Sequence, residues 1–218
     1  MPAFFSMAKV KLIIFDLDGT LIDAYPAIIK SFNYTMDKLG YSQQPGLVIR
    51  RAVGLGDKGL LAPFIAAQDA DRAVALYRRD QRRSLAKYSR VFNGVYRLLA
   101  QLKSRGYNLA VASNRPTEFS LILLRHLKLD KYFDYVLCAD KLTAGKPHPE
   151  ILIKILRKFK IKNTEAVYAG DMVIDAQAGR RAGIKTIIVT TGSSSLAQIK
   201  QEKPCLIIRK ISELPRFL

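Results

Sequence analysis

Short apolar runs alternate along the chain with stretches in which apolar residues recur at helical spacing. The apolar runs are almost continuous, which is typical of strands buried on both faces of a parallel sheet. They lie at Val10–Phe15, Asn108–Ser113, Tyr135–Ala139, Ala166–Ala169, Thr186–Val189 and Cys205–Ile208. The helical stretches between them lie at Val95–Ser104, Thr117–Leu127, Pro149–Phe159 and Ile174–Ala182. This alternation predicts an α/β fold with a doubly wound, Rossmann-like parallel sheet.

One long region interrupts the alternation. Residues 22–90 contain no convincing buried strand, and their apolar spacing predicts helices over Tyr25–Leu39, Asp57–Ala67 and Asp69–Lys87. We therefore expect a core made of residues 1–21 and 91–218, with residues 22–90 inserted as a helical cap domain. Ligands of open α/β sheets bind at the carboxyl ends of the strands, so an insertion after the first strand is placed to act as a lid.

The overall composition is that of a soluble globular protein, with 49% hydrophobic residues and a mean hydropathy of +0.03. No apolar stretch reaches the roughly 18 residues that a membrane span needs, so we expect no membrane association. The two cysteines, Cys138 and Cys205, lie in apolar runs and show no metal-binding spacing. We expect both to be buried free thiols in a reducing compartment, which indicates a cytoplasmic protein.

The charge of the chain is strongly positive. Lys and Arg number 36 against 18 for Asp and Glu, which gives a net charge of +18 and a pI of about 10.0. Such a field attracts polyanions and small phosphorylated substrates. The basic residues are scattered over the predicted helices and form no basic tail, so a solvated basic surface is favoured over nucleic-acid binding, which stays open as an alternative.

Polar residues that can take part in catalysis or ligand binding follow four of the predicted strands. Asp16 and Asp18 follow the first strand, in the motif DLDGT, and Ser113 and Asn114 end the second, in VASN. Lys146 lies in the loop after the third strand, in KPHP. Asp171 and Asp175 follow the fourth strand, in GDMVID. The carboxyl ends of parallel strands meet at one edge of a sheet. We therefore expect these side chains to converge there.

This ordered set resembles the motifs of the haloacid dehalogenase-like hydrolase superfamily, and the inserted helices resemble its helical cap type, in particular phosphoglycolate-phosphatase-like members. The resemblance implies a Mg2+-dependent phosphatase of small phosphorylated metabolites such as phosphoglycolate, a sugar phosphate or a nucleotide-like compound. It also implies that Asp171 is a metal ligand. A monomer or a homodimer is expected.

The residues themselves support an aspartyl-phosphate mechanism. Asp16, first after the strand, is the candidate nucleophile. Asp18 is placed to protonate the leaving alkoxide and then to activate water. An anionic nucleophile approaching a phosphate needs cations, because each like-charge pair at about 4 Å costs about 4 kcal/mol at an effective dielectric of 20. Lys146 is one cation, and Mg2+ is expected as the other.

Oxygen ligands for Mg2+ are available at the same edge of the predicted sheet. Asp16, the backbone carbonyl of Asp18 and Asp171 suit the ion, while Asp175 either supports the metal or orients Lys146. The Ser113 hydroxyl and the Asn114 backbone amide are expected to bind phosphate oxygens.

The acid at position 18 can protonate an alkoxide leaving group. This indicates the reaction of a phosphatase or of a phosphomutase. The pattern DGTL is more typical of the phosphatases of the family. A phosphomutase and a nucleic-acid-associated phosphatase or binding protein remain the alternatives.

A loop of the predicted cap is a candidate for substrate specificity. The segment RRAVGLGDKG combines glycines with basic residues and resembles the substrate-facing loop of phosphoglycolate-phosphatase-like proteins, so Arg51 or Lys58 could bind a carboxylate or a second phosphate. A flexible loop without such a role is the alternative. The chain departs from the family pattern at Arg115, where many relatives have Lys. It departs again at Thr191–Ser195, which replaces a glycine-aromatic stretch.

Overall fold

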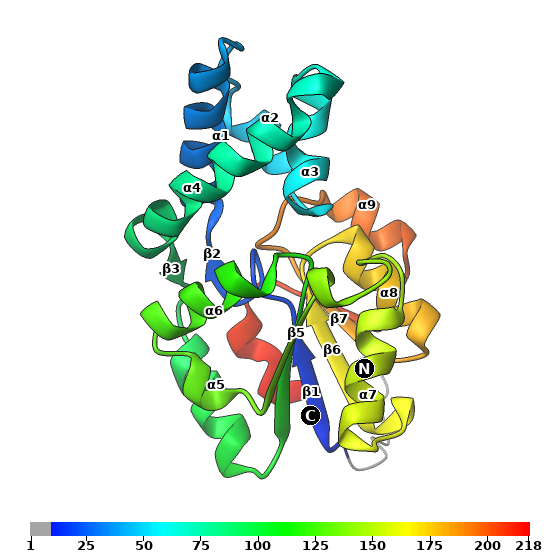
Figure 1. The fold of residues 1–218 in the computed structure, drawn as a ribbon. Helices are drawn as coiled ribbons and strands as arrows, with labels where there is room; N and C mark the ends of the chain where they lie inside the picture. The colour runs from blue at the N-terminus through cyan, green and yellow to red at the C-terminus, as the bar shows by residue number, and fades with distance from the viewer. Residues whose placement is uncertain (1–9) are drawn as a thin grey trace.

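The computed structural model describes residues 10–218, and its core is a six-stranded sheet in the order β5-β4-β1-β6-β7-β8 (Figure 1). Every neighbouring pair in this sheet is parallel. The strands are β1 (Leu12–Phe15), β4 (Asn108–Ser113), β5 (Tyr135–Cys138), β6 (Ala166–Gly170), β7 (Lys185–Val189) and β8 (Leu206–Ile208). The α/β fold predicted from the sequence is confirmed. Because β1 lies between β4 and β6, the residues that follow these three strands are neighbours.

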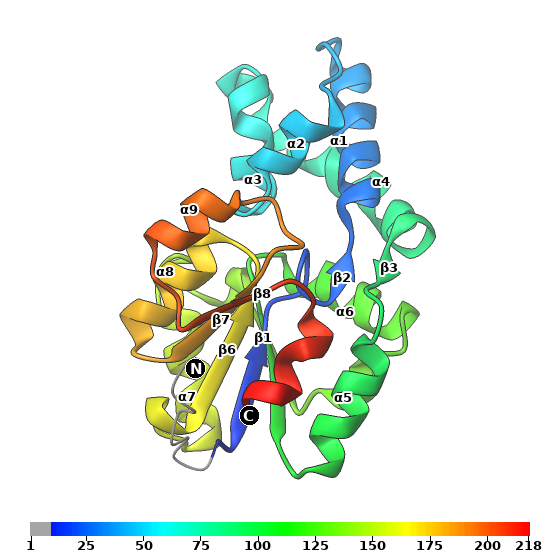
Figure 2. The same ribbon diagram turned by 180° about the vertical axis from the view of Figure 1, so that it is seen from behind.

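Helices cover both faces of the sheet, and β1 shows how its sequence serves both. Ile13 and Phe15 pack on one face with α5 (Val95–Ser104) and α6 (Thr117–His126). Leu12 and Ile14 pack on the other face with α7 (Glu150–Phe159) and α8 (Val173–Ala182). Successive side chains of a strand point to opposite faces, so a strand between two helical layers must be apolar at every position. Figure 2 shows the same two layers from behind.

Four helices of residues 22–90 stand above the carboxyl ends of the strands (Figure 1). They are α1 (Tyr25–Leu39), α2 (Gly46–Ala52), α3 (Gly56–Leu61) and α4 (Ala70–Tyr88). A short antiparallel ribbon of β2 (Ile22–Asp23) and β3 (Arg90–Val91) joins them to the sheet. The last helix, α9 (Leu196–Gln201), follows β7.

Two details of the sequence prediction were wrong in this region. The helix expected over Asp57–Ala67 ends at Leu61 and continues only as a short 3-10 turn, Ala62–Phe64. Pro63 explains this break, because proline has no backbone N–H to donate and its ring collides with the preceding turn. The short helix α2 was not predicted, since its seven residues give too few turns for a helical period to show.

The cysteines differ in environment. Cys138 is buried at the end of β5, whereas Cys205 is exposed just before the edge strand β8, so the expectation that both are buried was wrong. An edge strand has a neighbour on one side only, which leaves the residues at its end open to solvent. In the part of the chain that the structure describes, no helix has the length and apolar character needed to cross a membrane.

Candidate active site

The turn that follows β1 places two acids at the floor of a pocket between the cap helices and the sheet. Asp16 is 6% exposed, and its N–H donates to the carbonyl of Ala169 on the adjacent strand β6. Gly19 then turns the chain at φ +87°, a backbone conformation that favours glycine. A Cβ at Gly19 would lie only 2.3 Å from Asp171 Oδ2, so the turn also requires glycine for space.

Lys146 is the positive centre of the site. Its ammonium group lies 2.7 Å from Asp16 Oδ1, 2.8 Å from Asp175 Oδ1, and 3.0 Å from both the Ala112 carbonyl and the Tyr168 hydroxyl. The side chain is almost fully buried. A buried charge needs partners of this kind to offset the loss of water. The structure therefore fixes this lysine rather than leaving it a mobile surface group.

The protonation of this group follows from burial and charge. Desolvation raises the pKa of Asp16 to about 6, although Lys146 acts in the opposite direction. Burial alone lowers the pKa of Lys146, but the carboxylates of Asp16 and Asp175 outweigh it, and the net shift is upward. Lys146 is therefore charged at neutral pH, and Asp16 becomes ionised as the pH rises to neutrality.

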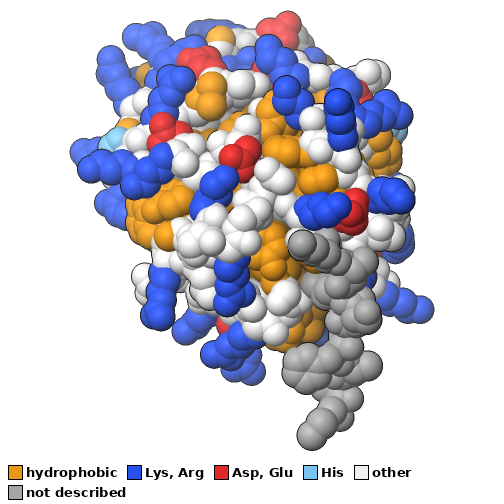
Figure 3. Space-filling view, turned by 90° about the horizontal axis from the view of Figure 1, so that it is seen from below, with side chains coloured by type: hydrophobic (Ala, Val, Ile, Leu, Met, Phe, Trp, Pro, Cys, Tyr) orange, Lys and Arg blue, Asp and Glu red, His pale blue; other side chains and the backbone are white. Residues whose placement is uncertain are grey.

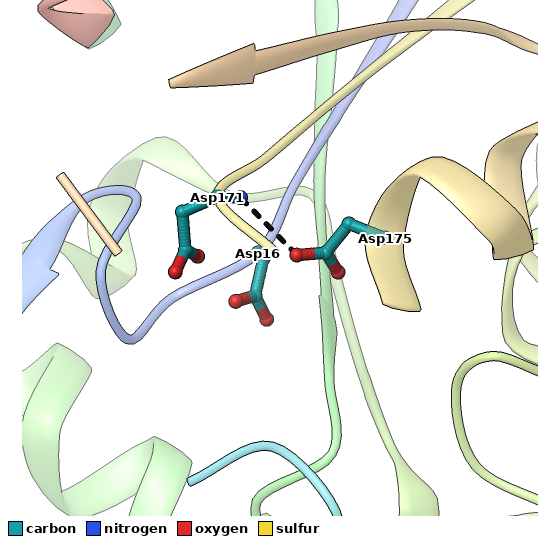
Figure 4. A group of neighbouring side chains, drawn as sticks. All are labelled: Asp16, Asp171 and Asp175. Carbon is teal, nitrogen blue, oxygen red and sulfur yellow. Dashed lines mark hydrogen bonds between the residues drawn. The ribbon is translucent and has the colours of Figure 1, made fainter. Parts of the chain in front are cut away.

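Asp16 follows β1, whereas Asp171 and Asp175 lie together between the end of β6 and the first turn of α8; the three form a buried acidic cluster (Figure 4). One oxygen of each lies within 4.8 Å of those of the others. Asp171 Oδ1 accepts from the Thr20 hydroxyl at 2.8 Å, while its Oδ2 is buried with no hydrogen-bond partner within residues 10–218. Burial raises the pKa of Asp171, and the charge of Asp16 raises it further. An unpaired, buried carboxylate oxygen beside a second carboxylate fits a hard cation such as Mg2+.

Asp175 is fully engaged by the protein. Its Oδ1 accepts from Lys146 and from the Tyr168 hydroxyl, the latter at 2.5 Å. Its Oδ2 accepts from the N–H groups of Asp171 and Met172 at 3.1 and 2.9 Å. Both oxygens of Asp175 thus hold other parts of the site in place.

Asp18 lies on the cap side of the site, where sequence reasoning missed its partner. Arg115 Nε lies 2.9 Å from Asp18 Oδ2, and Arg115 Nη1 lies 3.0 Å from Gln81 Oε1 on α4. Asp18 Oδ1 is buried and has no hydrogen-bond partner in the described part of the chain. The one signal in the sequence was the position of Arg115, directly after Ser113 and Asn114.

Ser113 and Asn114 end β4 beside Lys146, as expected from the strand order. Ser113 Oγ accepts from the N–H of Arg115 at 3.1 Å. The Asn114 side chain donates to the carbonyls of Gly54 and Lys146 at 2.7 and 2.9 Å and accepts from the Lys146 N–H at 2.8 Å. Asn114 therefore also ties the cap to the lysine loop, a role its side chain was not expected to have.

The two basic cap residues expected at the substrate do not line the pocket. Arg51 and Lys58 are exposed and absent from its walls, because they lie on the outward sides of α2 and α3. The adjacent Arg50 instead donates to the carbonyls of Thr191 and Gly192 at 2.8 and 3.3 Å. Its guanidinium also stacks on Tyr25, 4.1 Å from the ring centroid. The segment 191–195, where the chain departs from the family pattern, thus forms a second contact between cap and core.

Comparison with known proteins agrees with the fold and with the class of protein. The family model of haloacid dehalogenase-like hydrolases matches residues 13–189, and the chain belongs to this family. It is 33% identical over 191 residues to a phosphoglycolate phosphatase of Nitrosospira multiformis, with 84% of each chain covered. It is 31% identical over 212 residues to a putative pyrophosphatase PpaX of Caldanaerobacter subterraneus, covering 96% of this chain and 95% of that protein.

A solved structure gives the same picture. The crystal structure of a predicted phosphoglycolate phosphatase from Haemophilus somnus superposes with a TM-score of 0.90 at 26% identity, covering 96% of this chain and 98% of that one. The chain is thus a phosphatase of the haloacid dehalogenase-like family, a phosphoric monoester hydrolase, as its motifs predicted.

Proposed function

We propose that the chain hydrolyses small phosphate monoesters with Mg2+ through an aspartyl-phosphate on Asp16. The observation that carries this proposal is the state of the Asp16 carboxylate. Its Oδ1 is held by Lys146 at 2.7 Å, and its Oδ2 has no hydrogen-bond partner among residues 10–218 although Asp16 lines the pocket. One oxygen is thus fixed and the other is free to attack phosphorus.

The reaction then proceeds in two balanced steps. Asp16 Oδ2 forms a bond to phosphorus as the bond to the ester oxygen breaks, and Asp18 gives its proton to the departing alkoxide. Asp18 next takes a proton from water as that water attacks phosphorus, which releases inorganic phosphate and restores the Asp16 carboxylate. Asp18 Oδ1, the oxygen without a partner, is the atom that carries the proton.

The remaining residues bind and orient. We assign Asp16, Asp171 and the backbone carbonyl of Asp18 as metal ligands, and the acidic cluster and the unpaired Asp171 Oδ2 support this choice. When bound, Mg2+ supplies positive charge that offsets the repulsion between phosphate and nucleophile. Asp175 is assigned to hold Lys146, because both of its oxygens are occupied. Ser113 and Asn114, beside Lys146, are assigned to the phosphate oxygens.

The cap and the cellular setting complete the proposal. Residues 22–90 act as the cap over a core of residues 1–21 and 91–218, and the ribbon of β2 and β3 at both boundaries supports a hinge there. The candidate substrates are phosphoglycolate, a sugar phosphate or a nucleotide-like phosphate. The buried free thiol of Cys138 supports a reducing compartment, the cytoplasm. We propose that the chain acts as a monomer or as a homodimer.

The experiment is hydrolysis of p-nitrophenyl phosphate by the purified chain with and without Mg2+. Asp16→Asn should lower kcat by at least about a thousandfold, because the nucleophile is lost. Asp18→Asn should accumulate a phosphorylated chain, detected by intact-mass spectrometry. Asp71→Asn, an exposed carboxylate of the cap, is the control and should behave as the parent. Activity that survives in Asp16→Asn would refute the mechanism.

The two alternatives have their own tests. A phosphomutase would convert a sugar phosphate into its isomer and would need a bisphosphate, so product analysis separates it from a phosphatase. Nucleic-acid binding would give affinity that falls steeply with salt. Figure 3 shows Lys and Arg spread around the face seen from below rather than gathered in one patch, so this face offers no single basic patch for a nucleic acid.

A further inference from the structure

The cap side of the pocket is mostly apolar and carries one charged side chain among the described residues. Ile28 of α1, Leu60 of α3 and Tyr77 of α4 are buried residues that line it. Among the described residues, Asp57 of α3 is the one charged cap residue in its walls. The Asp57 side chain is 10% exposed, and its Oδ2 accepts from Arg78 Nε at 2.7 Å.

The partner of Asp57 does not turn the pocket positive. Arg78 is absent from the pocket walls, and its side chain is 43% exposed, so water screens its charge. Asp57 Oδ1 has no hydrogen-bond partner within residues 10–218. The cap therefore presents one carboxylate and otherwise uncharged, mostly apolar side chains to the part of a substrate that points away from the phosphate.

The cations that do line the pocket are already engaged. In the described chain they are Lys146 and Arg115. Lys146 is held between Asp16 and Asp175, and Arg115 between Asp18 and Gln81. A second anionic group on a substrate would enter a site of largely buried side chains without a free cation, and burying a charge in that way is unfavourable.

The basic residues of the neighbouring cap loop do not change this balance. Arg50 is occupied by the carbonyls of Thr191 and Gly192 and by the ring of Tyr25. Arg51 and Lys58 are exposed and lie outside the pocket. A carboxylate in the pocket would thus meet Asp57 before it met any of these three cations.

The pocket is also small. Its cavity volume is about 50 Å³, well below the roughly 300–1,000 Å³ of pockets that enclose drug-sized ligands. With the cap in this position, a phosphoryl group leaves space for an alcohol of few atoms. A nucleoside or a hexose would require the cap to move away.

We propose that the substrate is a phosphate monoester of a small alcohol that carries no negative charge, either neutral or bearing an ammonium group that Asp57 can bind. This inference rests on the proposed phosphatase function and narrows its substrate class. The proposed substrate differs from those in the names of the relatives. Phosphoglycolate releases an alcohol that carries a carboxylate, and pyrophosphate releases a phosphate, so both leaving groups carry negative charge. In this proposal the substrate is selected by Asp57 and the apolar wall of the pocket rather than by Arg51 or Lys58.

The test compares three two-carbon esters of matched size with Mg2+ present: 2-hydroxyethyl phosphate, phosphoethanolamine and phosphoglycolate. We expect kcat/KM for the better of the first two to exceed that for phosphoglycolate by at least about tenfold. If turnover of all three is too slow to measure, their inhibition constants against p-nitrophenyl phosphate hydrolysis decide in the same order. Phosphoglycolate as the best substrate or the tightest inhibitor overturns the proposal.

A matched pair of variants tests the role of Asp57. Asp57→Asn keeps the shape of the side chain and removes its charge, so the ratio of kcat/KM for phosphoglycolate to that for 2-hydroxyethyl phosphate should rise about threefold or more. Asp71→Asn removes a charge from the exposed cap surface and should leave this ratio unchanged. A ratio that moves equally in both variants, or in neither, contradicts the proposal.

The outcomes also distinguish a failure of this inference from a failure of the proposed phosphatase function. Loss of the proposed function would appear as absent Mg2+-dependent hydrolysis of the aryl ester or as activity retained in Asp16→Asn. Failure of the inference alone would appear as normal, Asp16-dependent hydrolysis of the aryl ester together with a preference for phosphoglycolate.

Discussion

Arg115 Nε lies 2.9 Å from Asp18 Oδ2 while the same guanidinium donates through Nη1 to Gln81 on α4. One buried arginine therefore joins the acid that follows β1 to a helix of the cap. Burial alone would lower the pKa of Arg115, but Asp18 outweighs it and the net shift is upward, so the arginine stays charged. The position of the cap and the orientation of Asp18 are linked through this side chain.

Arg115→Met should cost about 3 kcal/mol of unfolding free energy, because it leaves the carboxylate of Asp18 without its partner in a site that is mostly closed to water. It should also lower kcat by about tenfold or more, since Asp18 would no longer be held in place. Urea denaturation and hydrolysis of p-nitrophenyl phosphate measure the two effects.

Arg115→Lys is the matched control for this prediction. It keeps the charge, but all of its N–H donors lie on one nitrogen and cannot span Asp18 and Gln81 as Nε and Nη1 of the guanidinium do, so it should restore stability better than turnover. An Arg115→Met variant with parental stability and kcat would show that the ion pair is incidental.

Asn114→Asp should loosen the cap. The parental amide donates to the carbonyls of Gly54 and Lys146, and a carboxylate has no proton to donate to either. We expect a loss of about 2 kcal/mol in unfolding free energy and a higher KM, because both carbonyls lose a partner and one of them belongs to the cap loop. Thermal unfolding and steady-state kinetics test this.

The control for Asn114 is Asn163→Asp, an exposed residue just before β6, at the end of that strand opposite the active site. It makes the same chemical change away from the contact between cap and core and should leave KM and stability close to the parent. If the two variants have the same KM, Asn114 does not hold the cap.

The sequence was sufficient for the parts of the site that each strand places on its own. Asp16, Ser113 and Asp171 each follow a continuous apolar run, and parallel pairing brings the ends of such runs to one edge. The strand order itself, with β1 at the centre, then sets them side by side. Periodicity and motif order were therefore enough to predict both the fold and this cluster.

The cap was harder to predict, because its contacts depend on where whole helices lie. The contact of Gln81 with Arg115 spans 34 positions, and that of Asn114 with Gly54 spans 60. No local pattern encodes such pairs. The same limit applies to Arg51 and Lys58, whose basic side chains suggested a substrate site although the helices turn them outward. Tertiary placement, rather than residue type, decides which arginine meets the pocket.

Mg2+ should stabilise the chain more at pH 8 than at pH 5. Burial raises the pKa of Asp16 from 3.8 to about 6 and also raises that of Asp171, so the metal-free folded state binds more protons than the unfolded state across this range. Its stability therefore falls as pH rises through about 4 to 6, when these groups are forced to ionise in a buried site. A divalent cation relieves that repulsion, whereas protons compete with it at low pH.

The measurement is the thermal midpoint with and without Mg2+ at the two pH values. Asp171→Asn removes one of the interacting carboxylates and should abolish most of the difference. A shift caused by Mg2+ that is equal at pH 5 and pH 8, or unchanged in Asp171→Asn, would place the ion elsewhere.

Gly19→Ala should impair metal binding beyond its effect on the backbone. The new Cβ would lie 2.3 Å from Asp171 Oδ2 and 2.7 Å from Asp171 Cγ, so the carboxylate must move away from the acidic cluster. Gly19 also has a φ of +87°, where an alanine is strained by about 1–2 kcal/mol. We expect Mg2+ affinity to fall by at least about tenfold, read from the concentration that gives half-maximal phosphatase activity and from the Mg2+-induced thermal shift.

Gly106→Ala isolates the backbone strain from the collision. Gly106 has a φ of +81°, close to that of Gly19, but a Cβ there meets nothing within 4 Å. The two variants should therefore lose similar stability from strain in the absence of metal, apart from what the displaced Asp171 adds. Only Gly19→Ala should need more Mg2+, because only its Cβ reaches a proposed ligand. Equal Mg2+ requirements in the two variants would mean that Asp171 does not hold the ion, since moving its carboxylate would then have no effect on binding.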